Sequence, residues 1–462
     1  MGEIQKAYIT PHPPIIIPEV GKGREQDAAA TIEAYDLVGR QIRDLAPQVI
    51  IITTPHGTVY ENYIHISLEE KLIGSFKDFG APEVQIEIKN DIELVDKIIG
   101  FAQICGIDSG GLGVQENNLD HGALVPLYYI TKYYTDFSLI RISISDLPFE
   151  QLYIFGHCIQ KAVAQSNRKV VFVGSGDLSH KLSNDGPYGY AEQGPLFDHL
   201  FNQIIIAADF RKLLNMDEDL CRAAGECGLR SFVMMAGALN GFNIKSNILS
   251  YECPFGIGYM VAEFSIDGRD LSRDLISFYD CKRTCELEAT RKAEDPYVNL
   301  ARLTLEHYIK TGKVIDIPDY MPDEMFKRQA GVFISLKKQG QLRGCIGTIF
   351  PVTDSIAEEI IQNAISSGTR DPRFNPIKDF ELNRLVYSVD VLGEPESIRG
   401  IEELDILRYG IIVKAGYRRG ILLPDLEGVE TTEQQVNIAL SKAGIHKDES
   451  YLMERFEVIR HR

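Results

Sequence analysis

The sequence predicts an α/β fold for its first two thirds and a second, smaller domain after it. In the first part, short apolar runs of the kind that form buried strands alternate with stretches of helical periodicity. The chain has 462 residues, which is more than one hydrophobic core usually serves, so two or three domains are expected. A highly charged stretch at 267–296 then interrupts the alternation and separates the two parts.

Four apolar runs are predicted to form strands of one central sheet. The runs VIIITT at 49–54 and KVVFV at 169–173 are short, continuous and rich in β-branched residues, as in strands buried on both faces. Helical periodicity between the runs favours a mixed or parallel sheet with helices on both sides. The other strands are expected at 7–10 and 139–144, and the helices at 28–45, 92–104, 121–129 and 152–165.

The chain is expected to contain an N-terminal domain, a linker with some helix, and a C-terminal domain. Their ranges are 1–270, 271–290 and 291–462. The third range begins a new pattern of one amphipathic helix followed by separated strands, which indicates an α+β domain. The helix is expected at 297–311 and the strands at 330–336 and 386–391.

The composition and the charge argue against several classes of function. The formal net charge is -18, so nucleic acid and anionic membrane surfaces would repel the chain. No run reaches the roughly 18 apolar residues of a membrane span, and no signal-peptide pattern opens the sequence, so a cytoplasmic protein is expected. The 8 cysteines include no CxxC pair, which argues against a zinc ribbon or a disulfide framework. The oligomeric state stays open.

Three histidines come shortly after predicted strands. His12 lies in TPHPP, His56 in TTPHGT and His180 in GSGDLSH. In open α/β sheets, ligands bind outside the carboxyl ends of the strands, so these three side chains are expected to share one pocket. Imidazole binds iron and zinc well and moves protons near neutral pH. The pattern therefore predicts a mononuclear metal site, with non-haem Fe(II) as the first candidate.

Two further positions belong to the predicted pocket. His121 stands at a predicted helix start, with Asp120 placed to cap the helix, and the helix dipole there favours a neutral ring or an anionic ligand. Two histidines and one carboxylate leave open metal positions for substrate and O2. The segment AGECG offers Glu226, with Cys227 beside it. Glu226 is equally suited to be an acidic residue at a helix start.

Five motifs together resemble the class III (LigB-type) extradiol dioxygenases and the related Memo-type proteins. TPHPP, TPHG, NLDHG, GSGDLSH and AGECG stand in the order of that family, and the resemblance covers residues 5–265. It implies that His12, His56 and Glu226 hold the metal, that His180 is the catalytic acid and base, and that His121 orients substrate or oxygen.

The third metal ligand has two candidates. In Memo-type proteins a cysteine takes the place of the glutamate of the ring-cleaving enzymes, and here Glu226 and Cys227 stand side by side. Glu226 would keep the Fe(II) dioxygenase site. Cys227 would give a softer site that suits copper(I) or zinc as well as iron.

The C-terminal part resembles the AMMECR domain family over residues 290–460. The motif LRGCIGT at 342–348 carries the resemblance, supported by RDPRFNPI at 370–377 and GILLP at 420–424. The family implies an α+β fold rather than an activity. From the residues themselves, Cys345 beside Arg343 is either a reactive thiol or a small residue in a tight turn. The charged side chains of Arg370, Asp371 and Arg373 form either an ion-pair network or an anion site.

The first functional hypothesis is an Fe(II)-dependent oxidoreductase that opens a catechol-like ring with O2. The second is a Memo-like metal-binding module that works with a radical SAM enzyme, because proteins joining these two domains resemble components of such a system. A zinc-dependent hydrolase is less favoured, since the sequence has no HExxH motif. The sequence names no substrate.

Overall fold

The computed structural model describes residues 2–112, 117–338, 340–426 and 428–462. The chain divides into two compact units, residues 1–279 and 280–462. Each unit encloses hydrophobic clusters of its own. The stretch expected to be a linker contains a short 3-10 turn and most of the helix α10 (Leu275–Ala293).

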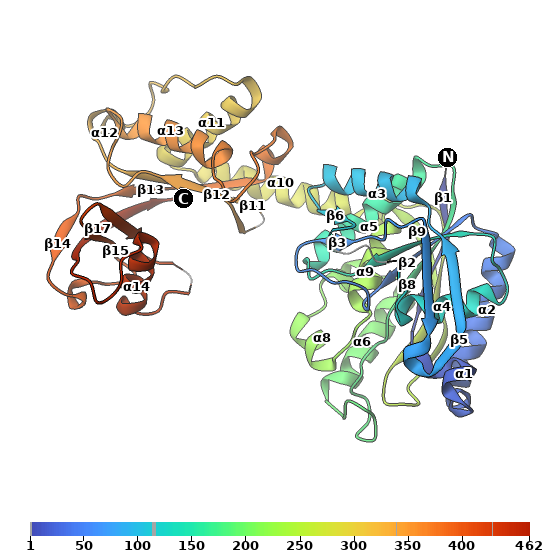
Figure 1. The fold of residues 1–462 in the computed structure, drawn as a ribbon. Coiled ribbons are helices and arrows are strands. Elements are labelled where there is room, and N and C mark those ends of the chain that lie inside the picture. The colour runs from blue at the N-terminus through green and yellow to red at the C-terminus, as the bar shows by residue number, and fades with distance from the viewer. Residues whose placement is uncertain (1, 113–116, 339, 427) are drawn as a thin grey trace. The chain divides into compact units, whose positions relative to one another are not determined.

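The first unit is built on a mixed sheet with the strand order β7-β2-β8-β1-β10-β9 (Figure 1). Strands β7, β2, β8 and β1 run parallel to one another, whereas β10 is antiparallel to β1 and β9 is antiparallel to β10. The predicted mixed sheet is therefore confirmed. The strands are β1 (Glu3–Thr10), β2 (Val49–Thr54), β7 (Ser138–Ser143), β8 (Lys169–Ser175), β9 (Phe242–Glu252) and β10 (Tyr259–Arg269).

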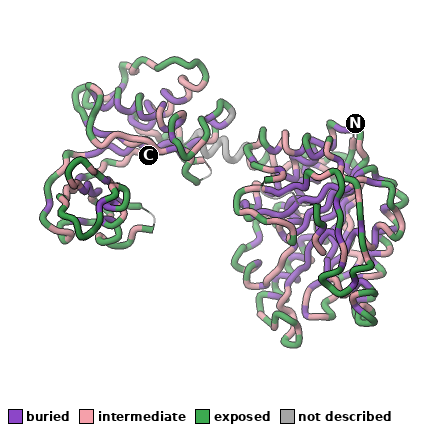
Figure 2. The backbone as a smooth tube through the Cα atoms, in the orientation of Figure 1, coloured by how far each residue is buried: buried purple, intermediate pink, exposed green. Residues whose placement is uncertain are grey.

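The central strands of this sheet are buried, as the purple tube in Figure 2 shows. Their successive side chains face opposite sides of the sheet. On β2, Ile51 belongs to the cluster that contains α3, α5, α6 and α9, while Ile50 and Ile52 belong to the cluster that contains α2 and α4. Fully burying such a side chain contributes about 1.5–3 kcal/mol, which explains why β2 is apolar without alternation. The helices are α2 (Ala29–Leu45), α3 (Ile92–Ile104), α4 (His121–Thr131), α5 (Phe149–Ala164), α6 (Gln193–Ala207) and α9 (Leu229–Ala238).

The carboxyl ends of three neighbouring parallel strands lie at one edge of the sheet. Gly174 of β8 pairs with Thr53 of β2 on one side and with Ile9 of β1 on the other. The loops that follow β2, β8 and β1 therefore leave the sheet side by side, which positions the site described below.

Smaller elements of the first unit surround this framework. The antiparallel pair β4 and β5 joins the cluster of α2 and α4, and its connecting turn carries Phe79. Continuous apolar runs did not predict this hairpin, because β4 alternates between exposed and buried residues and β5 is mostly exposed. These elements are α1 (Pro18–Gly21), β3 (Ile64–His65), β4 (Lys71–Phe76), β5 (Ala81–Lys89), β6 (Ser109–Gly110), α7 (Phe210–Leu214) and α8 (Glu218–Ala224).

The second unit is an α+β domain, as expected, with an antiparallel sheet in the order β12-β11-β13-β17-β15-β16. Helices α11 and α13 pack on its first half and α14 on its second half. The elements are α11 (Pro296–Thr311), α12 (Asp323–Lys327), β11 (Val332–Lys338), β12 (Gln341–Gly347), α13 (Ile356–Thr369), β13 (Leu385–Leu392), β14 (Glu396–Ile398), β15 (Tyr409–Ala415), β16 (Arg418–Leu422), α14 (Thr432–Ala443) and β17 (Leu452–His461).

No helix within the described part of the chain is both long and apolar enough to cross a membrane.

Because each unit encloses its own buried clusters, we expect residues 1–279 and residues 280–462 to fold when expressed separately. Thermal unfolding followed by circular dichroism should show one cooperative transition for each fragment. The full-length chain is the reference. A fragment that melts without a cooperative transition, or that is recovered only as aggregate, would contradict the independence of the two units.

Candidate metal centre

Three predicted site residues converge beyond the ends of the parallel strands. His12 follows β1, His56 follows β2, and Cys227 precedes α9. The Nε2 atoms of His12 and His56 are 2.9 Å apart, and the Cys227 Sγ lies 3.6 Å from the His12 Nε2. The ligand atoms of the three side chains all lie within 4.8 Å of one another. His12 is buried while His56 is exposed, so the cluster opens to solvent on the His56 side.

The orientation of the His12 ring is fixed by a chain of hydrogen bonds. The Ser175 hydroxyl donates its one proton to the carbonyl oxygen of Gly122 at 2.5 Å. The hydroxyl oxygen of Ser175 also lies 3.0 Å from the Nδ1 of His12. Because the only hydroxyl proton is donated to Gly122, this oxygen can only accept a hydrogen bond from Nδ1. The proton of the neutral His12 ring consequently resides on Nδ1, which leaves the lone pair of Nε2 directed toward His56 and Cys227.

A second set of contacts positions His56 and His121. Thr54, the last residue of β2, donates to Asp120 at 2.5 Å and accepts the backbone N–H of His56 at 3.2 Å. Asp120 also caps α4 by accepting from Ala123, as predicted. The ring of His121, the first residue of α4, stacks on His56 with 4.0 Å between the ring centroids. His121 thus lines the cluster without joining either group of metal-ligating side chains found among the described residues.

Close backbone packing brings Cys227 to the cluster. A Cβ on Gly176, just after β8, would lie 2.0 Å from the Cα of Gly228, so the two chains can approach this closely only with glycine there. The carbonyl of Asp177 accepts the N–H groups of Cys227 and Gly228 at 3.3 and 3.1 Å. The N–H of Asp177 in turn donates to the Cys227 Sγ at 3.3 Å, a contact that favours the thiolate form.

Glu226, the other candidate for the third ligand, serves the start of α9. Its Oε2 accepts the N–H of Leu229 at 2.7 Å, which satisfies one of the free donors of the first helical turn. Neither group of metal-ligating side chains among the described residues includes Glu226. Of the two neighbours, the structure therefore places Cys227, and not Glu226, beside His12.

His180 lies next to this cluster, together with a carboxylate that the sequence analysis did not single out. Asp177, His180 and Cys227 form a second group whose ligand atoms lie within 4.8 Å of one another. The Oδ1 of Asp177 accepts the backbone N–H of His12 at 2.8 Å. The ring of His180 faces Tyr188 at 5.1 Å, and among the described residues nothing hydrogen-bonds to its buried Nε2.

Burial keeps the four histidine rings of the site neutral. It lowers the pKa of His12 far below its ordinary value, and the nearby rings of His56, His121 and His180 lower that pKa further. Burial likewise lowers the pKa of His56, and those of His121 and His180 to about 4. Neutral imidazole is the form that binds a metal or accepts a proton, so the site is ready for either task at neutral pH.

The acidic groups respond to burial in the opposite direction. Burial raises the pKa of Asp177 to about 7, although the N–H of His12 opposes this, and it raises the pKa of the Cys227 thiol well above its ordinary value. A cation between these groups would compensate the cost of charging them. The site thus combines neutral nitrogen donors with buried acidic groups.

The donor set fits one metal ion. Nitrogen and sulfur donors held about 2.0–2.3 Å from an ion at angles near 90–110° lie roughly 2.9–3.6 Å apart. The His12–His56 and His12–Cys227 separations of 2.9 and 3.6 Å match that range. Without an ion, one of the two facing imidazole nitrogens must carry a proton, and a metal would take the place of that proton.

Residues of LRGCIGT and RDPRFNPI in the second unit take part in ion pairs and hydrogen bonds. Arg343 makes two hydrogen bonds to the carboxylate of Glu381, at 2.9 and 3.0 Å, and so does not serve the Cys345 thiol. Asp371 accepts the N–H of Cys345 at 2.8 Å and pairs with Arg373. These contacts favour the structural interpretation of Asp371 and Arg373 over an anion site.

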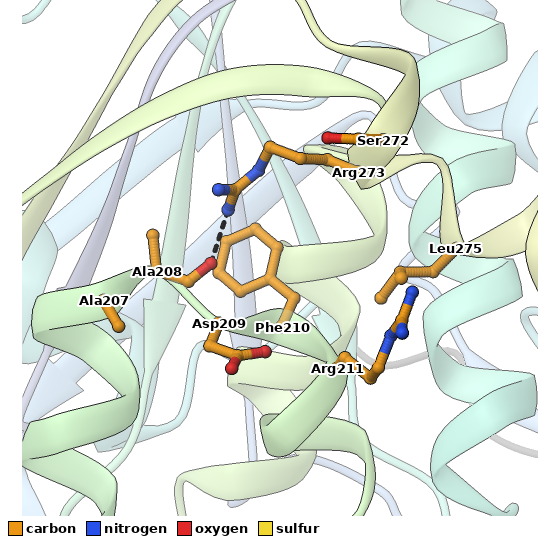
Figure 3. Close-up of a pocket in the computed structure, with 8 residues that line it drawn as sticks. All are labelled: Ala207, Ala208, Asp209, Phe210, Arg211, Ser272, Arg273 and Leu275. Atoms are coloured by element: carbon orange, nitrogen blue, oxygen red, sulfur yellow. Dashed lines mark hydrogen bonds between the residues drawn. The ribbon is translucent and has the colours of Figure 1, made fainter.

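A separate cavity of about 330 Å³ lies beside Phe210 and Arg273 in the first unit (Figure 3). The guanidinium of Arg273 donates to the carbonyl of Ala208, and Asp209 accepts the N–H of Lys212. The charged groups of this cavity are thus used within the protein, and none of them belongs to the histidine cluster.

The fold and the histidine–cysteine cluster together define an α/β domain with a candidate metal site, joined to a second domain. Residues 6–262 match the family model described as the catalytic LigB subunit of aromatic ring-opening dioxygenase, and residues 298–461 match the AMMECR1 model. The chain belongs to the LigB family and carries an AMMECR1 domain after the LigB domain.

One relative matches nearly the whole chain, and others match about a third of it. A protein from Clostridium acetobutylicum is 45% identical over 98% of both chains. A protein from Thermotoga maritima is 49% identical over 37% of this chain and 98% of its own length. A solved structure of an uncharacterized protein from Pyrococcus horikoshii is 35% identical, covers 36% of this chain and 88% of that chain, and has a TM-score of 0.34.

Sequence reasoning missed several residues that shape the site. Asp177 stands inside GSGDLSH, three positions before His180, and an acid at that place was the available signal. Ser175 and Thr54 gave no signal of their own, because their roles depend on contacts with Gly122 and Asp120, which lie far away in the sequence.

Replacing each candidate for the third ligand should separate their roles. We expect Cys227→Ala to lose stoichiometric metal, because it removes the thiolate beside His12. Glu226→Gln should keep the metal, because an amide oxygen can still accept the Leu229 N–H. Metal content measured by mass spectrometry, with circular dichroism to verify folding, gives the comparison. Metal lost in Glu226→Gln and kept in Cys227→Ala would reverse the assignment.

Proposed function

We propose that the N-terminal domain is a metal-dependent oxidoreductase module in which His12, His56 and Cys227 hold one metal ion. The observation that carries this proposal is the contact of Cys227 Sγ with His12 Nε2 at 3.6 Å, while Glu226 is occupied at the start of α9. Membership of the LigB family, whose model is named for a ring-opening dioxygenase, supports oxidative chemistry.

A thiolate ligand limits which metal ions suit the site. Two imidazoles and one thiolate suit Fe(II), copper(I) and zinc, and only the first two undergo one-electron chemistry. Fe(II) is our first candidate, with copper as the alternative. The ligand charge is the same as in a two-histidine, one-carboxylate site, but sulfur is the softer donor.

When bound, the metal would lower the pKa of a coordinated substrate hydroxyl and supply the redox centre. His180 is placed to take that proton, because its ring is neutral at pH 7 and its buried Nε2 has no partner among the described residues. His121 stacks on His56 and borders the space where a planar substrate would lie. Tyr188, 59% exposed, covers the outer face of His180.

A second candidate function is ring opening of a catechol-like substrate with O2, as in the extradiol enzymes. The neutral, unpartnered His180 favours it, because that reaction needs an acid and base next to the metal. Under this proposal a small aromatic diol and O2 are the substrates. The cysteine in the ligand group argues for the first candidate instead.

We further propose that the module works with a radical SAM enzyme, in line with the joined LigB and AMMECR1 domains. In that setting the metal centre would modify or deliver a redox-sensitive group rather than open a free catechol.

Anaerobic purification followed by metal analysis tests the first proposal. We expect one metal ion per chain in the wild type and none in the double variant His12→Ala, His56→Ala, because that variant removes both imidazole ligands. Oxygen uptake with a panel of catechols then separates the two candidates. Ring opening would establish the dioxygenase. Redox-active metal without uptake of oxygen would favour the Memo-like module, and metal retained by the double variant would refute the site.

The role of His180 can be separated from metal binding. We expect His180→Ala to retain the metal and to lose about 10²–10⁴-fold in turnover of any substrate found, the range for removal of a general acid or base. The double variant His12→Ala, His56→Ala is the metal-free reference. Loss of metal in parallel with turnover would make His180 a ligand, through the group it forms with Asp177 and Cys227.

A further inference from the structure

A pocket of about 600 Å³ lies on the second unit, where α13 borders the loop that follows α11. The loop contributes Val314, Ile315 and Ile317, and α13 contributes Ile361 and Ile365. Val314 is 59% exposed, so the outer wall of the pocket presents an apolar side chain to solvent. The centre of the pocket is therefore apolar, and its volume is in the range of ligand sites.

The pocket follows one side of α13 along nearly the whole helix. Its lining residues on α13 and at the end of the helix are 358, 361, 362, 365, 366 and 370, which are spaced by three or four positions and so form one stripe. Twelve residues separate the two ends of this stripe, a distance of about 18 Å at 1.5 Å per residue. The pocket is thus an elongated groove, called here the α13 groove.

The two ends of the α13 groove carry opposite charges. Glu358 lies at one end and Arg370 at the other, and both are exposed. Among the described residues the guanidinium of Arg370 has no hydrogen-bond or ion-pair partner. The neighbouring Asp371 and Arg373 are already paired with each other. Of the charged residues in RDPRFNPI, Arg370 alone is therefore free to bind an external group.

We propose that the α13 groove binds a short peptide segment of a partner protein. The segment has an apolar centre, a basic residue at one end and an acidic residue or carboxylate at the other. An extended chain rises about 3.3 Å per residue, so five or six residues span about 18 Å. The apolar centre would cover the exposed Val314, and the charged ends would meet Glu358 and Arg370.

The charge pattern selects this occupant over a small apolar molecule. A compact ligand near Ile365 would leave at least one of the two charged ends without a partner, since they lie about 18 Å apart along the helix. Complementary charges at both ends also give an orientation, because like charges placed opposite each other are unfavourable. Asp316, which also lines the groove, adds a second acid and so disfavours a purely anionic peptide.

Three fluorescent hexapeptides with the same apolar centre test the proposal on the full-length chain. Their terminal side chains are one lysine and one glutamate, two lysines, or two glutamates, and their backbone ends are blocked. Fluorescence anisotropy should show saturable binding that is tightest for the mixed-charge peptide. We expect each mismatched end to weaken binding about two- to five-fold, the range for exposed ion pairs.

Charge reversal of the protein identifies the two ends. We expect Arg370→Glu to prefer the peptide with two lysines and Glu358→Arg to prefer the peptide with two glutamates. Val314→Glu should weaken all three peptides, because it places a charge on the exposed apolar wall. Arg399→Glu is the matched control, since Arg399 is exposed and does not line the groove.

The outcomes are decisive in either direction. A switch of peptide preference in the two charge-reversal variants, with none in Arg399→Glu, supports the proposal. The absence of saturable binding by any of the three peptides overturns it. Peptide binding that Val314→Glu and Arg370→Glu leave unchanged also overturns it. If no peptide binds but the apolar dye anilinonaphthalene sulfonate does, the groove is a small-molecule site and the proposal is wrong. Metal content is unaffected in every case, so this test is independent of the metal centre.

Discussion

The parallel alignment of β2, β8 and β1 is the constraint on which the site depends. Because Gly174 pairs with both Thr53 and Ile9, the chains leaving these strands start at the same level of one sheet edge. Hydrogen bonds between strands cannot shift by one residue without moving every buried side chain to the other face. The points at which the loops that carry the histidines begin are therefore fixed by the register of the sheet.

The donor set is determined by contacts between loops rather than by the strands. Gly176 and Gly228 touch, and this contact draws the start of α9 toward β8. The side chain of Ser231 then fastens α9 to the backbone of Thr53. In this arrangement the thiol of Cys227 is directed into the cluster and the carboxylate of Glu226 back to its own helix. A thiolate at this position gives a softer metal site than a carboxylate would.

In the second unit, acidic side chains pair with arginines. Glu381, in the turn at 379–384, pairs with Arg343 of the edge strand β12. Asp371, just after α13, pairs with Arg373 and accepts the N–H of Cys345 on the same strand. The guanidinium of Arg370 stands apart from this network at the end of the α13 groove. The motif RDPRFNPI therefore contains paired residues that hold the fold together and one arginine that borders the groove.

The sequence by itself determined the class of each domain, the four parallel strands of the central sheet and the helices α2 to α5. Continuous apolar runs such as 49–54 have only one stable environment, a strand covered on both faces, and the placement of histidines after such runs follows from reading along the chain. The sequence could not decide whether Glu226 or Cys227 lies beside His12, because neighbouring residues belong to the same local sequence pattern. It also could not find the tautomer-fixing Ser175, whose partner Gly122 is 53 positions away. Only the tertiary structure decided which side chain lies beside His12 and which one fixes its tautomer. Both depend on which backbone groups remain unpaired once the sheet and helices have packed.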